Sequence, residues 1–155
     1  MANLKRFLTP RSIAVYGGSW AMNVIEQLQI SKYNGEIWPV HPNRSDIGGI
    51  KCFADTQSLP GVPDAAFIGV NRELTIEIIG ELNSIDAGGA ICFASGYREA
   101  NEEHQIKNSG YLDLQDQLVS AAGNMPMLGP NCYGYLNYLD NVTLWPDQHG
   151  GHQVD

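Results

Sequence analysis

The sequence predicts an α/β fold: a doubly wound, mostly parallel sheet of five or slightly more strands, of the Rossmann-like type. Short apolar runs alternate along the chain with segments whose apolar residues recur at helical spacing. Each run ends in residues such as Gly, Pro, Asn or Ser, as expected where a buried parallel strand passes into a loop. Strands joined by crossover helices run parallel, so helices are expected on both faces of the sheet.

Five apolar runs are the expected strands, and they cover residues 12–16, 36–40, 65–70, 89–93 and 125–128. Pro39 lies inside the second run and Pro126 inside the fifth. Proline cannot donate a hydrogen bond to a neighbouring strand, so it suits sheet edges and the first residues of strands. The second and fifth strands are therefore the weaker members of the set.

Three segments between these runs have helical periodicity, and they cover residues 20–30, 73–85 and 111–122. Residues 47–61 fit neither pattern. After Asn131 the chain is rich in Tyr, Asn and Gly, and its last residues are polar. We therefore expect one domain over residues 1–145 and a linker or disordered tail over residues 146–155.

The composition excludes several classes of protein. With 155 residues, of which 43% are hydrophobic, the chain fits one domain with a sizeable core. A net charge of −8 disfavours binding to nucleic acid or to an anionic membrane, because both require a basic surface. The three cysteines lie far apart, which matches neither a disulfide framework nor a zinc site, so we expect no metal. No secretory leader or membrane-spanning run is evident, and we expect a cytoplasmic protein.

A glycine turn follows the first expected strand. Gly17, Gly18 and Ser19 lead directly into a helix, and ligands of doubly wound sheets bind at the carboxyl ends of the strands. Backbone N–H groups at a helix N-terminus hold a phosphate without needing a net positive charge. The third glycine of the dinucleotide fingerprint is missing, however, and the two glycines also fit a simple tight turn.

The residues after the second expected strand discriminate between phosphate-bearing ligands. A nicotinamide dinucleotide site has an Asp or Glu about twenty residues beyond its glycines. This sequence instead has His41, Pro42, Asn43 and Arg44 there. Arg44 suits an extra phosphate, as on the ribose of coenzyme A or of a phosphorylated nicotinamide cofactor, and it equally suits an ordinary solvated loop.

Five motifs at the five strand ends together carry a resemblance to a known family. They read SIAVYGGS, GEIWPVHPNRSDIGGIKCF, PDAAFIGVN, GAICFASGYRE and LGPNCYGYLN, and GPNCYG is the most distinctive part. In this order they resemble the CoA-binding domain of nucleoside-diphosphate-forming acyl-CoA synthetases, relatives of the succinyl-CoA synthetase α subunit. The resemblance covers about residues 8–145.

The resemblance implies that coenzyme A is the cofactor. It places the coenzyme A phosphates at Gly17, Gly18 and Ser19, and the nucleotide end at His41, Pro42, Asn43 and Arg44. The remaining residues that it implies come from the third, fourth and fifth strand ends: Val70 and Asn71, Ser95 and Gly96, then Pro130, Asn131 and Cys132, the last three towards the thiol.

The chain departs from the family pattern in its first loop. That loop usually continues through a Pro and a basic residue to another Gly, whereas here Trp20, which we expect to be a packing residue, follows Ser19 directly. The family's phosphohistidine domain and ATP-grasp region do not fit into 155 residues. We therefore expect a non-catalytic, cofactor-binding part of an acyl-CoA synthetase, without catalytic residues of its own, that works with other domains or subunits.

Two alternatives remain open on the sequence. One is an NAD(P)-binding Rossmann sensor or a fragment of an oxidoreductase, because such domains share the glycine turn. The other is a degenerate, non-enzymatic interaction domain, which the shortened glycine loop favours.

Overall fold

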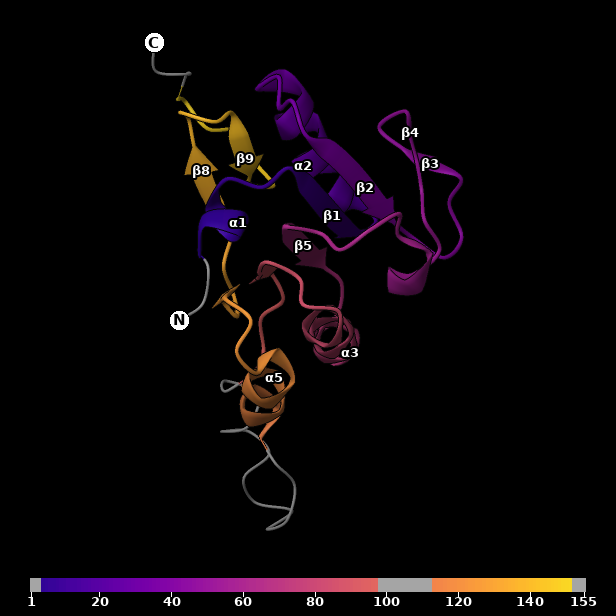
Figure 1. Cartoon of the computed structure of the whole chain (residues 1–155), viewed down its shortest axis with the longest axis vertical. Coiled ribbons are helices and arrows are strands. Elements are labelled where there is room, and N and C mark those ends of the chain that lie inside the picture. Colours follow the sequence, from indigo (N-terminus) through magenta and orange to yellow (C-terminus); the bar gives the residue numbers. More distant parts are fainter. Residues whose placement is uncertain (1–3, 98–112, 152–155) are drawn as a thin grey trace.

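The computed structural model describes residues 4–97 and 113–151, and at its centre is a five-stranded parallel sheet (Figure 1). The strands stand in the order β2-β1-β5-β6-β7. Their bounds are Ser12–Gly17 for β1, Glu36–Val40 for β2, Ala65–Gly69 for β5, Ala90–Cys92 for β6 and Met127–Leu128 for β7. This is the flavodoxin-like order of doubly wound sheets, in which the direction of winding reverses between β1 and β5, the first and third strands of this sheet in chain order. The predicted fold class is confirmed.

Both prolines of the expected strands lie at edges of the sheet. β2 is one edge strand, and the carbonyl oxygen of Pro39 accepts a hydrogen bond from the Phe53 N–H at 2.8 Å on the side away from β1. The missing N–H of Pro39 therefore removes no bond between β1 and β2. β7 is the other edge strand, and Pro126 directly precedes it.

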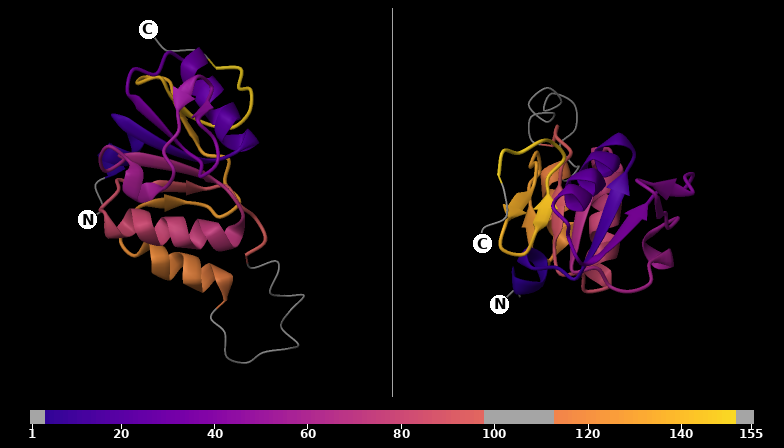
Figure 2. Two further views of the ribbon diagram at one scale, coloured as in Figure 1. Left: turned by 90° about the vertical axis from the view of Figure 1, so that its right-hand side faces the viewer. Right: turned by 90° about the horizontal axis from the view of Figure 1, so that it is seen from above.

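The helices cover the two faces of the sheet. α2 (Ser19–Ile30) packs on one face, whereas α3 (Arg72–Ser84) and α5 (Leu114–Ala122) lie side by side on the other (Figure 2). Alternate strand residues divide accordingly: Val15 and Phe67 face α2, and Tyr16 and Ile68 face α3. None of the helices in the described ranges is long and apolar enough to cross a membrane.

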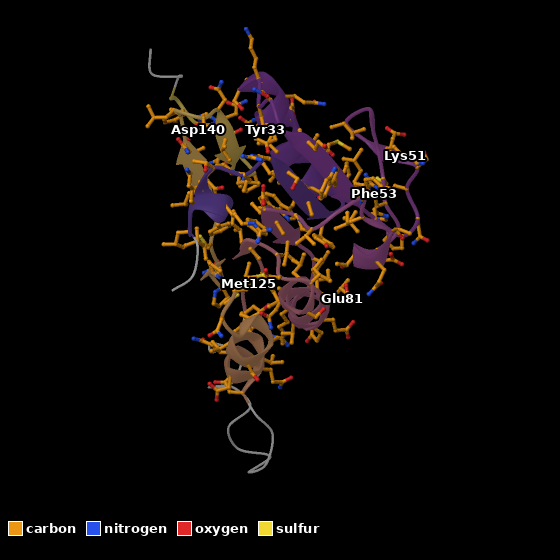
Figure 3. The ribbon with its side chains drawn as sticks, in the orientation of Figure 1. Tyr33, Lys51, Phe53, Glu81, Met125 and Asp140 are labelled. Carbon is orange, nitrogen blue, oxygen red and sulfur yellow. The ribbon has the colours of Figure 1, made fainter. Side chains whose placement is uncertain are left out.

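Several shorter elements arise where the sequence carries no clear periodicity. They are α1 (Leu4–Leu8), the hairpin of β3 (Asp46–Ile47) and β4 (Ile50–Lys51), the 3-10 turn η1 (Thr56–Ser58), and the hairpin of β8 (Tyr135–Asn137) and β9 (Val142–Leu144). Figure 3 shows the β3–β4 arm, marked by Lys51 and Phe53, and the β8–β9 hairpin, with Asp140 at its turn beside Tyr33.

The β8–β9 hairpin belongs to the domain rather than to a linker-like end. Val142 and Leu144 are fully buried in the cluster that includes the apolar face of α2. Beyond it, Pro146 is buried and the Tyr138 hydroxyl lies 3.1 Å from Nδ1 of His149. The boundary after residue 145 stays a prediction.

Replacing Gly80 with alanine is expected to stabilise the domain by about 0.5–1 kcal/mol, because glycine inside a helix loses more conformational entropy on folding than alanine. Gly80 lies within α3, and a Cβ added there would meet only the Cβ of Ala121 on α5, at 3.9 Å. Urea denaturation of Gly80→Ala measures the gain. Gly150→Ala, outside any helix and with open space around it, is the control. A less stable Gly80→Ala variant would show that α3 and α5 leave no room for a methyl group.

Candidate functional site

A cavity of about 460 Å³ opens at the carboxyl ends of β5, β6 and β7. It lies next to the point between β1 and β5 where the winding of the sheet reverses, which is where doubly wound sheets bind their ligands. Four segments of the chain supply its lining: the first turn of α2, the end of β5, the loop after β6 and the loop after β7. The lining residues are Trp20, Gly69, Val70, Asn71, Phe93, Ala94, Ser95, Asn131, Cys132 and Tyr133.

The glycine turn beside this cavity depends on Gly17. Its φ of +126° is a conformation that residues with a side chain rarely adopt. A Cβ at this position would stand 2.5 Å from the carbonyl oxygen of Gly69, its partner in the β1–β5 pairing. Because Gly17 has no Cβ, the end of β1 can lie against the end of β5, and the chain can turn into α2 within two residues.

The N-terminus of α2 carries no side-chain cap. Gly18 occupies the cap position, and the first turn of α2 contains no acidic residue. By contrast, Oδ1 of Asn71 accepts from the Leu74 N–H at 2.9 Å to cap α3, and Oδ1 of Asp113 accepts from the Gln115 N–H at 3.0 Å to cap α5. Both of those helices also have an acid in the first turn. α2 thus presents open N–H groups and the positive end of its dipole to a ligand.

Arg44 adds a positive charge at this helix end. Its Nη2 atom lies 3.6 Å from the position that a Cβ on Gly18 would take, although Arg44 comes from the loop after β2. The ion pairs within residues 4–97 and 113–151 join Arg6 to Asp64 and Arg72 to Glu73, so no carboxylate there neutralises Arg44. An exposed guanidinium beside an uncapped helix N-terminus is an arrangement suited to an anion.

The loop after β6 is held by the start of α3. Nη1 of Arg72 donates to the carbonyl oxygen of Gly96 at 2.7 Å. The Tyr97 hydroxyl donates to the Arg72 carbonyl at 3.3 Å, and the Cys92 thiol donates to the Tyr97 oxygen at 3.5 Å. Burial raises the pKa of both Tyr97 and Cys92, so both stay protonated and act as donors. This chain of bonds fixes the backbone of the loop that lines the cavity.

The loop after β7 is tied to β6 through its backbone. Asn131 N–H donates to the Ala94 carbonyl at 2.9 Å, and Cys132 N–H donates to the Cys92 carbonyl at 3.3 Å. A Cβ on Gly129, whose φ is +113°, would stand 2.4 Å from that same Cys92 oxygen. The tight approach brings Cys132, which is half-buried, into the cavity lining.

The residues predicted from the sequence divide into three groups. Five line the cavity: Val70, Asn71, Ser95, Asn131 and Cys132. Four others lie at the helix N-terminus beside it: Gly17, Gly18 and Ser19 belong to the turn and the helix, and Arg44 reaches them from the loop after β2. The remaining five lie outside the lining: His41, Pro42 and Asn43 in the loop that carries Arg44, Gly96 bound to Arg72, and Pro130 next to Asn131.

Three aromatic residues of the lining were not expected there. Trp20, Phe93 and Tyr133 lie within or next to the strand-end motifs, and Trp20 was expected only to pack. The signals that would have found them are the position of Trp20 after the glycine turn, of Phe93 directly after β6 and of Tyr133 within GPNCYG.

Residues 11–138 match the sequence model of the family described as the CoA binding domain. The chain belongs to this family. Coenzyme A is therefore its cofactor, and the resemblance seen in the sequence is confirmed. The domain is homologous to the N-terminal part of ADP-forming acyl-CoA synthetases.

Individual relatives agree with this assignment. The chain is 29% identical over 150 residues to a trans-feruloyl-CoA synthase from an unknown prokaryote, covering 91% of this chain and 20% of that protein. It is 25% identical over 145 residues to the α subunit of an ADP-forming acetate–CoA ligase II of Pyrococcus furiosus, covering 90% of this chain and 30% of that subunit.

A solved structure shares the fold. The apo form of a dinucleotide-forming acetyl-coenzyme A synthetase 1 from Candidatus Korarchaeum cryptofilum matches with a TM-score of 0.80 and 25% identity, over 92% of this chain and 31% of that chain. The CoA-binding domain described here thus spans between a fifth and a third of the length of these relatives.

Proposed function

We propose that the N-terminus of α2 holds the pyrophosphate of coenzyme A through Gly17, Gly18 and Ser19, and that Arg44 meets the phosphate on the ribose. The observation that carries this proposal is the open helix end beside an unneutralised guanidinium. A helix N-terminus supplies N–H donors and about half a positive charge. These local groups let a protein with a net charge of −8 accept a polyanionic cofactor.

The cavity suits the remaining part of the cofactor. No Lys, Arg, His, Asp or Glu is among its ten lining residues, which matches the neutral pantetheine arm. From α2 the arm would cross Val70 and Asn71 and pass Ser95, and its thiol would lie near Asn131 and Cys132. His41, Pro42 and Asn43 would border the nucleotide end with Arg44, and Gly96 and Pro130 would shape the two loops.

The chain would act as the cofactor-holding part of a cytoplasmic, ADP-forming acyl-CoA synthetase. A cysteine is present in the cavity lining, but no general base is. Phosphoryl and acyl transfer would therefore require the phosphohistidine and nucleotide-binding chemistry of other domains or subunits. The ADP-forming ligases among the relatives support this assignment.

The proposal is tested by isothermal titration of the purified chain with coenzyme A, beside NADH and NADP, together with thermal melts. Coenzyme A is expected to bind and to stabilise the native state by about 2.7 kcal/mol at one hundred times its dissociation constant. Binding of NADH in place of coenzyme A would favour the nicotinamide sensor. If no nucleotide binds, the shortened glycine loop has abolished cofactor binding and the chain is an interaction domain.

Replacing Arg44 with glutamine is expected to weaken coenzyme A binding at least about tenfold, because a charge-assisted hydrogen bond to a phosphate is worth about 1.5–3 kcal/mol. Dephospho-coenzyme A lacks the ribose phosphate that Arg44 is proposed to meet. Its affinity should therefore change by less than about twofold, or a few tenths of a kcal/mol. Titration calorimetry of both ligands measures the effect.

Lys51→Gln is the matched control, because it removes the same charge from the β3–β4 arm (Figure 3). If Arg44→Gln and Lys51→Gln lose the same affinity for coenzyme A, Arg44 acts only through long-range electrostatic attraction and not through a contact with the phosphate. An equal loss for both ligands would place Arg44 on the pyrophosphate instead.

A further inference from the structure

Four aromatic side chains form a continuous row from the start of α2 to the end of β9. The ring centroids lie 4.7 Å apart for Trp20 and Phe93, 5.6 Å for Phe93 and Tyr133, and 5.2 Å for Tyr133 and Trp145. Trp20, Phe93 and Tyr133 line the cavity, and we call these three the aromatic wall. They come from α2, the loop after β6 and the loop after β7.

The aromatic wall packs against neighbouring aromatic rings, but two of its side chains remain exposed to solvent. Phe93 packs on the buried Phe67 at a centroid distance of 5.6 Å, and Trp145 backs Tyr133. Trp20 is nevertheless 41% exposed and Tyr133 48% exposed. Large aromatic surfaces left open inside a cavity favour a ligand that covers them, through both apolar burial and ring contacts.

The lining offers no opposite charge to an anionic acyl group. None of the ten lining residues is a cation. A carboxylate brought into this cavity would lose hydration and would find only neutral donors such as the Ser95 hydroxyl, without a cation to pair with, which is unfavourable.

We propose that the acyl group joined to the cofactor thiol is neutral and apolar, of the aryl class, and that it packs against the aromatic wall. The inference rests on the proposed function, because the cofactor arm must bring its thiol to the loop after β7. Tyr133 directly follows Cys132 in that loop. A thiol near Cys132 therefore places its acyl group beside Tyr133 and Phe93.

The test compares four ligands by titration calorimetry: coenzyme A, acetyl-CoA, succinyl-CoA and benzoyl-CoA. Benzoyl-CoA is expected to bind about tenfold more tightly than acetyl-CoA, from ring contacts and apolar burial together. Succinyl-CoA should bind no more tightly than acetyl-CoA. In Trp20→Leu and in Tyr133→Leu the ratio of benzoyl-CoA to acetyl-CoA affinity should fall below about threefold. Two variants are used so that the test still stands if one of them fails to fold.

Tyr138→Leu is the control, because Tyr138 is an aromatic residue that contacts His149 rather than the cavity. It should keep the tenfold ratio. If the domain binds none of the four ligands, both the proposed function and this inference are overturned. If coenzyme A binds but benzoyl-CoA binds no more tightly than acetyl-CoA, only this inference is. A ratio that survives both leucine variants would also overturn it.

Discussion

Gly17→Ala is expected to lower the free energy of unfolding by at least about 4 kcal/mol, a large part of the roughly 5–15 kcal/mol that stabilises an ordinary domain. Two effects add. An alanine at φ +126° is strained, at a cost of about 1–3 kcal/mol. Its Cβ would also stand 2.5 Å from the Gly69 carbonyl oxygen. That oxygen belongs to the backbone of the neighbouring strand, so it cannot move aside without disturbing the β1–β5 pairing.

Gly49→Ala separates the two effects. Gly49 has a φ of +78°, but an added Cβ would meet no atom within 4 Å. This variant should lose only the cost of the left-handed conformation, about 1–2 kcal/mol. Urea denaturation of both variants gives the difference, which measures the collision with β5. An equal loss in the two variants would contradict the close approach of Gly17 to Gly69.

The five strands and the helices between them were predictable because each depends on local sequence. An apolar run followed by a turn residue predicts a buried parallel strand wherever it occurs, and the two prolines pointed to the weaker strands before the sheet order was known. The β8–β9 hairpin was not predictable in this way. Its Val142 and Leu144 are buried because the apolar face of α2 lies opposite, and that contact joins segments more than a hundred residues apart.

The site was predictable in its position more than in the roles of its side chains. The carboxyl ends of parallel strands meet at one edge of a sheet, so motifs at five strand ends had to converge. The sequence did not reveal that the Asn71 side chain caps α3, or that Arg44 reaches Gly18 from another loop. It also did not reveal the aromatic wall, which forms only when three distant segments meet.

Gly18→Asp is expected to weaken coenzyme A binding at least about 100-fold, a loss of about 2.7 kcal/mol, while changing the stability of the domain much less. Gly18 has a φ of −101° and a ψ of −103°, and an added Cβ would meet only Nη2 of Arg44, at 3.6 Å. An aspartate there would pair with Arg44 and bring a carboxylate to the N–H groups of α2, where it would differ from the glycine cap by only about a few tenths of a kcal/mol in stability. It would therefore occupy both groups that we assign to the phosphates.

Gly18→Asn is the control, because asparagine has nearly the same size and shape as aspartate but no charge. It retains the capping ability of aspartate without the charge, so its affinity should lie between those of the wild type and Gly18→Asp. Thermal melts and titrations of both variants are read together. A loss of binding in a variant whose melting temperature stays near that of the wild type cannot be attributed to unfolding. A Gly18→Asp variant that bound coenzyme A as the wild type does would exclude the N-terminus of α2 as the pyrophosphate site, while leaving the family membership intact.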